Sequence, residues 1–98
     1  MSHKQILDDL RQPVRDLRGQ IPALFEGFAA MNAAVMADGA LDAKTKELIA
    51  LAIAVTKQCD GCIASHARGA ARRGATAAEV ADALGVVIAM NGGPGTVH

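Results

Sequence analysis

The feature that most limits how this chain can fold is an unbroken apolar run, L-I-A-L-A-I-A-V, at residues 48–55. A helix through this run is apolar on every side, so other protein must surround it. The run is far shorter than the roughly 20 residues that cross a bilayer, so it predicts no membrane span. We expect a single domain over residues 1–98, and one copy that small has little surface with which to cover such a helix. The run therefore predicts a helical homo-oligomer.

The rest of the chain also predicts helices. It contains no Trp or Tyr and only two Phe, and no segment alternates apolar and polar residues over the length of a strand. Alanine-rich segments with apolar residues three and four positions apart dominate instead. We therefore expect an all-α fold, a helical bundle of about five to six helices.

Capping residues and helix breakers set the expected boundaries. Pro22 suits the first turn of a helix, and Asp42 and Asp60 are expected N-caps. T-A-A-E at 76–79 has the form of a capping box, and Gly74 suits a left-handed helix stop. The expected helical segments are about 3–11, then a short stretch over 14–17 after a break near Pro13, 22 to the Asp38-Gly39 pair, 43–57, 61–73, and 77–90 before the glycines at 92–95.

Charge and composition argue against several classes of function. Ten Lys and Arg residues balance ten Asp and Glu residues, which predicts no electrostatic capture of nucleic acid or of an anionic membrane. The start, M-S-H-K-Q-I-L-D-D-L, lacks the apolar core of a secretory signal. We therefore expect a cytoplasmic protein. In a reducing compartment, two cysteines in a C-x-x-C pattern indicate a redox or metal motif.

The residues best suited to chemistry gather in C-D-G-C-I-A-S-H, residues 59–66. With Asp60 as the cap, Cys62 falls in the first turn of a helix, where unpaired backbone N–H groups favour a thiolate. His66 follows four residues later on the same face, where its imidazole can accept the thiol proton. Cys59 lies close enough to form a disulfide with Cys62, which makes it the expected resolving thiol.

A fourth candidate, Glu47, lies upstream at the head of the apolar helix. If the helices before and after the turn at 58–60 pair antiparallel, Glu47 and His66 can meet between them, directly or through a water molecule. The carboxylate would then accept a proton behind the imidazole. Taken alone, Glu47 fits equally well as a solvated first-turn residue that complements the helix dipole.

Two other interpretations of these residues stay open. Cys59, Cys62 and His66 could bind a structural zinc ion with a fourth ligand from Glu47 or a neighbouring chain, although the sequence has no second C-x-x-C and no H-x-x-x-H. The two thiols could also be inert, partly buried packing residues.

The spacing of Glu47, eleven intervening residues and then Cys59-x-x-Cys62-x-x-x-His66 resembles the AhpD-like alkylhydroperoxidase and carboxymuconolactone decarboxylase superfamily. The segments 35–52 and 74–80 and the sequence M-N-G-G-P at 90–94 are also similar to its small single-domain members. The resemblance covers about 21–95.

This resemblance implies an all-α fold that forms homotrimers or homohexamers, with the C-x-x-C at the N-terminus of a central helix. It also implies peroxidase activity, in which Cys62 attacks the peroxide, Cys59 resolves it, and Glu47 and His66 relay protons. The substrate would be a peroxide or a disulfide, and an external dithiol or disulfide reductase would restore the thiols. No cofactor or metal is expected.

Two features depart from the family pattern. In the well-known alkylhydroperoxidase the residue before the second cysteine is a histidine, whereas this chain has Gly61, so one proton donor or hydrogen-bond partner is missing. The small members usually continue past G-G-P into a further helix, whereas this chain ends at His98. A general thiol–disulfide oxidoreductase or redox sensor, or a decarboxylase-like acid–base enzyme, is the alternative function. Retention of both thiols favours redox chemistry.

Overall fold

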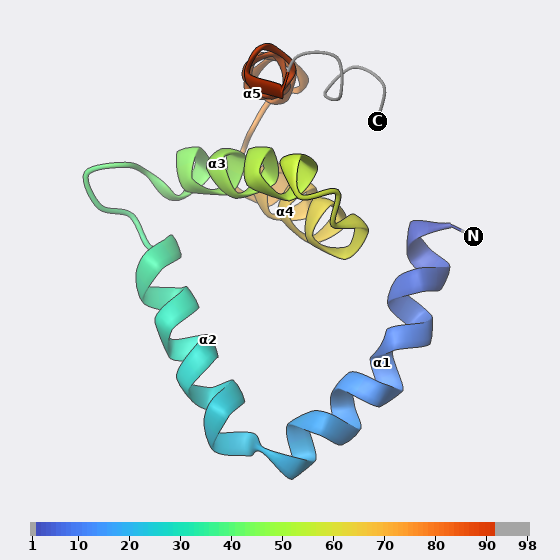
Figure 1. Cartoon of the computed structure of the whole chain (residues 1–98). Coiled ribbons are helices and arrows are strands. Elements are labelled where there is room, and N and C mark those ends of the chain that lie inside the picture. The colour runs from blue at the N-terminus through green and yellow to red at the C-terminus, as the bar shows by residue number, and fades with distance from the viewer. Residues whose placement is uncertain (1, 92–98) are drawn as a thin grey trace. The chain divides into compact units, whose positions relative to one another are not determined.

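A computed structural model describes residues 2–91 of the chain, with the backbone alone for His3. These residues form five α-helices and no strand, which confirms the predicted all-α class (Figure 1). The helices are α1 (His3–Gln20), α2 (Pro22–Met36), α3 (Ala43–Thr56), α4 (Asp60–Arg72) and α5 (Ala77–Asn91). None of them combines the length and the apolar character that crossing a membrane requires.

The chain divides into two compact units, an N-terminal unit (Met1–Ala37) with α1 and α2, and a C-terminal unit (Asp38–His98) with α3, α4 and α5. All of the buried apolar residues in the described part of the chain belong to the C-terminal unit. The single domain over 1–98 stays a prediction.

The predicted break near Pro13 is wrong, because α1 runs through it as one helix. A proline inside a helix removes one backbone hydrogen bond and crowds the carbonyl four residues earlier. Here one side-chain pair precedes the proline and another spans it, with Arg11 bonded to Asp8 at 3.0 Å and Gln12 bonded to Asp16 at 2.7 Å. The surrounding residues are exposed, so water can hydrate the carbonyl that the proline leaves without a partner.

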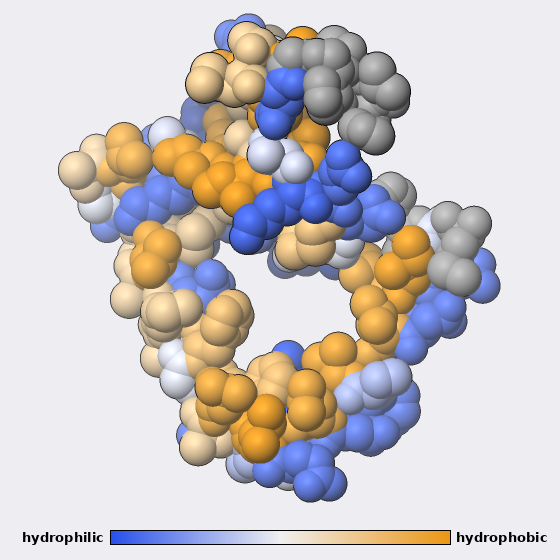
Figure 2. All heavy atoms as spheres, in the orientation of Figure 1, coloured by the Kyte–Doolittle hydropathy of each residue, from blue (hydrophilic) through white to orange (hydrophobic). Residues whose placement is uncertain are grey.

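Helix α2 begins at Pro22 as predicted, but none of its residues is buried. Four large apolar side chains, spaced four, three and four residues apart, lie exposed along one side of it: Leu24, Phe28, Met31 and Val35. We call these residues the α2 stripe. Apolar surface is visible near the α1–α2 junction and over α3 (Figure 2).

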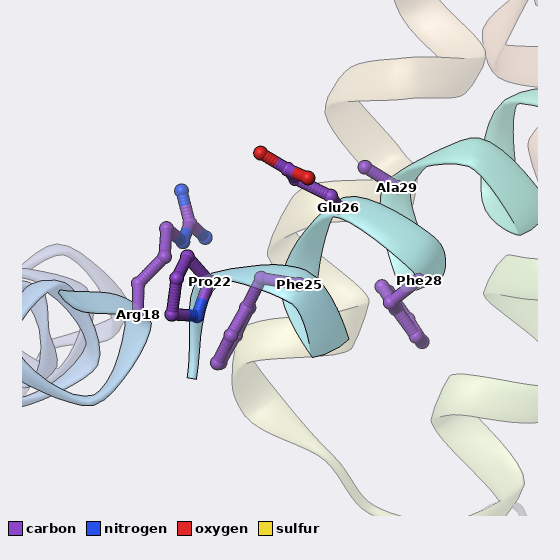
Figure 3. A pocket seen from close by; sticks show the side chains of 6 residues that line it. All are labelled: Arg18, Pro22, Phe25, Glu26, Phe28 and Ala29. Carbon is purple, nitrogen blue, oxygen red and sulfur yellow. The ribbon is translucent and has the colours of Figure 1, made fainter. Parts of the chain in front are cut away.

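A hollow at the α1–α2 junction lies wholly within the N-terminal unit (Figure 3). The guanidinium of Arg18 lies over the ring of Phe25, 5.2 Å from its centroid, as in a cation–π contact. The residues that line the hollow are Arg18, Pro22, Phe25, Glu26, Phe28 and Ala29. This contact joins the end of α1 to the start of α2.

In the C-terminal unit, α3 packs against both α4 and α5. Helix α3 supplies three of the buried residues and its two partners supply one each: Ala43, Leu51, Ala54, Ala70 and Val87. The turn from α3 to α4 is short because Gln58 adopts a positive φ of 57°, the left-handed conformation that few residues other than glycine take. The chain therefore reverses quickly and lays α4 back along α3.

Local capping signals explain most helix ends. The Asp42 carboxylate accepts the Thr45 N–H at 2.7 Å, so the predicted cap of α3 is confirmed. The capping box is also confirmed, since Glu79 accepts the Thr76 N–H at 2.9 Å and Thr76 accepts the Glu79 N–H at 3.1 Å. Gly74 follows α4 with a φ of 88°, as predicted. The glycines at 92–95, the expected stop of α5, lie outside the described residues.

Candidate active site

Helices α3 and α4 bring Glu47 and His66 into direct contact. Oε2 of Glu47 lies 2.9 Å from Nδ1 of His66, a hydrogen-bond distance, across 19 residues of sequence. The Glu47 side chain is only 15% exposed and that of His66 is 29% exposed, so solvent competes weakly for this bond. The predicted meeting of these residues is therefore confirmed, in its direct form. When the carboxyl group is ionised, Nδ1–H donates to it and Nε2 is left as the acceptor nitrogen.

The two cysteines are joined by a disulfide, with their Cα atoms 5.3 Å apart. The expectation that they lie close enough to bond is confirmed. The structure also places the C-x-x-C at the N-terminus of α4, where the resemblance put it.

The predicted N-cap of α4, Asp60, is wrong, because Asp60 is the first residue inside the helix and Cys59 is the cap. Cys59 has the extended backbone of a cap residue, with φ −97° and ψ 98°, and its sulfur accepts the N–H of Cys62 at 3.4 Å. Sulfur is a weaker acceptor than the oxygens that usually cap helices, so the usual capping preferences pointed one residue too far along. The Asp60 carboxylate still complements the dipole from the first turn.

Exposure separates the two cysteines. Cys62 is exposed at the surface of α4, whereas Cys59 is half-buried in the turn. His66 lies four residues after Cys62, about 6 Å further along the helix axis and on the same face. Gly61, between the cysteines, presents no side chain there.

One residue beside the site was not predicted. Gly69 lies inside α4, three residues after His66, and a Cβ atom built on it would lie 2.6 Å from Cδ and Oε2 of Glu47. The sequence did contain a signal, because a glycine inside a helix weakens it and so calls for a reason.

In the described part of the chain, no three His, Cys, Asp or Glu side chains gather closely enough to hold a metal ion.

Known proteins are similar in sequence to most of this chain. Residues 22–98 match the carboxymuconolactone decarboxylase family. Uncharacterized protein 4 in the cox locus of Paracoccus denitrificans is 44% identical over 73 residues, which cover 74% of this chain and 66% of that protein. An uncharacterized protein of Cupriavidus necator is 43% identical over 77 residues, which cover 79% of this chain and 68% of that protein. The chain thus spans about two thirds of the length of these relatives.

Two solved structures share the fold. The crystal structure of an apo carboxymuconolactone decarboxylase family protein from Legionella pneumophila has a TM-score of 0.89 and 41% identity, and the match covers 97% of this chain and 85% of that one. A Thermotoga maritima protein has a TM-score of 0.73 and 28% identity, with 92% and 82% covered. The sequence match and the shared fold agree with the motif at Glu47, Cys59, Cys62 and His66: this chain belongs to the carboxymuconolactone decarboxylase family, within the AhpD-like superfamily.

Proposed function

We propose that this protein is a thiol-dependent peroxidase that reduces alkyl hydroperoxides through a disulfide cycle of Cys62 and Cys59. The observation that carries the proposal is a C-x-x-C disulfide at the start of α4, one helical turn before a histidine that is hydrogen-bonded to a largely buried glutamate. The disulfide pair can exchange two electrons, and the Glu47–His66 pair can take and return a proton.

The first step consumes the peroxide. In the reduced chain, Nε2 of His66 takes the proton of the Cys62 thiol, and the Glu47 carboxylate at Nδ1 stabilises the imidazolium that forms. The Cys62 thiolate attacks the terminal peroxide oxygen, an S–O bond forms and the O–O bond breaks. The electron pair leaves on the alkoxide, which takes the proton from His66 and departs as an alcohol. Cys62 is now a sulfenic acid.

The second step forms the disulfide. Cys59 attacks the Cys62 sulfur, the S–O bond breaks, and the hydroxide leaves as water after taking the Cys59 proton. The Cα separation of 5.3 Å lies within the range of disulfides, so ring closure fits the turn. An external dithiol or a disulfide reductase then supplies two electrons and two protons to restore both thiols.

The difference in exposure supports the assignment of roles. Peroxide and reductant arrive from solvent and reach the exposed Cys62 first, whereas the half-buried Cys59 meets a partner sulfur only within the turn. A resolving cysteine needs access to its neighbour rather than to bulk solvent. Cys62 therefore fits the attacking thiol and Cys59 the resolving one.

Cysteine substitutions test this function. With an excess of dithiol, we expect Cys62→Ser to abolish consumption of an alkyl hydroperoxide, because the attacking sulfur is gone. When the dithiol is removed before peroxide is added, Cys59→Ser should allow one turnover and leave a sulfenic acid, which dimedone traps for mass spectrometry. Ser65→Ala, an exposed change on the same helix, is the control and should match the wild type. Equal peroxide consumption by the wild type and Cys62→Ser would refute the proposal.

Thiol–disulfide exchange is a second candidate, supported by the exposed Cys62 and by Gly61 at the position where the alkylhydroperoxidase has a histidine. The same disulfide would then cycle against small-molecule or protein thiols. Comparing the rates at which an alkyl hydroperoxide and oxidised glutathione oxidise the reduced protein separates these functions, since a peroxidase reacts faster with the peroxide.

A decarboxylase-like acid–base enzyme would instead use Glu47 and His66 and keep its activity in Cys62→Ser.

A further inference from the structure

The Glu47 carboxylate lies directly against the backbone of α4 at Gly69. A Cβ atom at that position would lie 2.6 Å from Cδ, 2.6 Å from Oε2 and 2.8 Å from Oε1 of Glu47. Carbon atoms in proteins do not pack so closely, because these distances fall well inside van der Waals contact. Any side chain at residue 69 would therefore push the carboxylate away from the place it now occupies.

We propose that Gly69 is a positioning residue that holds open the space in which Glu47 binds His66. Gly69 follows His66 by three positions, so both lie on the face of α4 that meets α3. Without a Cβ at residue 69, the carboxylate can lie flat on the helix with Oε2 at 2.9 Å from Nδ1 of His66. The expected effect of Gly69 on peroxide turnover rests on the proposed peroxidase function. Its effect on the position of the Glu47 side chain does not.

The backbone conformation gives no other reason for a glycine here. Among the described glycines, a left-handed φ belongs to Gly74 alone, so alanine could adopt the conformation of Gly69 without strain. Alanine would also favour the helix more than glycine does. Gly85, inside α5, offers a matched comparison because a Cβ built on it has no atom within 4 Å.

The first experiment compares Gly69→Ala with Gly85→Ala by ¹⁵N NMR of the His66 imidazole in the reduced protein. We expect Gly69→Ala to shift the Nδ1 and Nε2 resonances, because the hydrogen bond to Glu47 is displaced. Gly85→Ala should leave them at their wild-type positions. Unchanged His66 resonances in a folded Gly69→Ala protein would overturn the proposal.

The second experiment asks whether Gly69 acts through Glu47 and also serves if Gly69→Ala alone does not fold. In a Glu47→Ala background there is no carboxylate to displace, so adding Gly69→Ala should raise the midpoint of thermal unfolding, as we also expect of Gly85→Ala in the wild type. A fall of that midpoint in the Glu47→Ala background would show that residue 69 clashes with something else, and the proposal would fail.

Activity provides a third measure that is independent of the first two. If the wild type consumes peroxide, Gly69→Ala should slow it by roughly 10- to 100-fold, as expected when a proton-relay group is misplaced by about 1 Å. A wild type without peroxidase activity would refute the proposed function. The NMR and unfolding experiments would still decide the role of Gly69, because they do not depend on activity. Wild-type rates in Gly69→Ala would overturn that role.

Discussion

At the level of single residues, the hydrogen bond between Glu47 and His66 leaves one imidazole nitrogen for the thiol in the proposed peroxidase cycle. Oε2 of Glu47 is hydrogen-bonded to Nδ1, so in the proposed cycle Nε2 is the nitrogen that accepts the proton of Cys62. In that cycle, the Glu47 carboxylate is proposed to stabilise the imidazolium while Cys62 is a thiolate. Geometry alone would hold the ring in place, but the charge is what favours the transferred proton.

Replacing Glu47 with glutamine separates charge from geometry. Glu47→Gln keeps an oxygen that can accept from Nδ1–H, but it loses the negative charge, so we expect peroxide turnover to fall roughly 100-fold. The midpoint of thermal unfolding should change little, because the side chain keeps its size. Steady-state peroxide assays and circular dichroism melts measure the two quantities. Glu26→Gln, an exposed change in the other unit, is the control, and equal losses in both variants would contradict the prediction.

At the level of helices, most boundaries could be predicted because a cap acts over three or four residues. Asp42, Gly74 and the Thr76–Glu79 box each carry their signal locally. The continuation of α1 through Pro13 was not predicted, because the side-chain pairs that accompany it, one before the proline and one spanning it, are not signalled by the proline itself. The cap of α4 was missed because a sulfur takes the place of the usual oxygen.

The site could be predicted in part for a similar reason. The four residues follow from helical spacing and from the family resemblance, but the direct Glu47–His66 bond depends on how far the chain turns at Gln58. Gly69 stood out in the sequence only as a glycine inside a helix, and its role could not be assigned without coordinates, because its partner lies on another helix, 22 positions earlier in the sequence. Sequence patterns thus predict the helices and their ends better than the contacts between helices.

An ion pair joins α3 to α5. Nζ of Lys44 lies 2.7 Å from Oε2 of Glu79, and the same carboxylate accepts from the Thr76 backbone through its other oxygen. The bond from Lys44 is the main cause that lowers the pKa of Glu79 below its ordinary 4.5, followed by the bond from the Thr76 N–H. The bond to Glu79 in turn raises the pKa of Lys44 above its ordinary 10.5.

These shifts predict how the packing of α5 depends on pH. A lowered carboxyl pKa stabilises the fold fully above the ordinary value of 4.5, and this contribution is lost as pH falls through the lower pKa of the folded chain. A raised lysine pKa acts in the opposite sense, so its contribution is present below pH 10.5 and is lost as pH rises through the higher pKa of the folded chain. The lowered pKa of Asp42, caused mainly by its bonds with Thr45, adds to the loss in acid.

We therefore expect the midpoint of thermal unfolding to fall as the pH drops below about 4.5, and to fall less in Glu79→Gln than in the wild type. Circular dichroism melts from about pH 3 to about pH 8 measure it. Asp82→Asn removes an exposed carboxylate from the same helix and should leave the acid dependence unchanged. An identical acid dependence in the wild type and Glu79→Gln would rule out a role for this ion pair.

At the level of the whole molecule, the α2 stripe is not buried by the described residues of its own N-terminal unit. Its four side chains are between 56% and 64% exposed, and α2 contains no buried residue. Exposed apolar side chains that line up on one helix face are typical of protein–protein interfaces. The apolar run of α3 adds exposed side chains at Ile49 and Ile53. We propose that further copies of the chain cover these surfaces, in a homotrimer or homohexamer.

A charge placed on the stripe tests this assembly. Sedimentation equilibrium of the wild type should give three or six times the chain mass, and Phe28→Glu should shift it to smaller species, because a carboxylate cannot be buried there unpaired. Ala33→Glu adds the same charge on the opposite side of α2 and should leave the mass unchanged. A wild type that sediments as a monomer at micromolar concentration would disprove the proposal.

The placement of the candidate site within a single chain has a genetic consequence. Glu47 comes from α3, and Cys59, Cys62 and His66 come from the start and first turns of α4 in the same unit. Under the proposed function every copy needs both residues in its own polypeptide, so we expect two defective alleles, one without Cys62 and one without Glu47, not to complement each other. In a cell that carries an intact allele beside a Cys62-deficient one, the intact copies keep complete sites of their own, so under the proposed function we expect that cell to retain peroxide reduction.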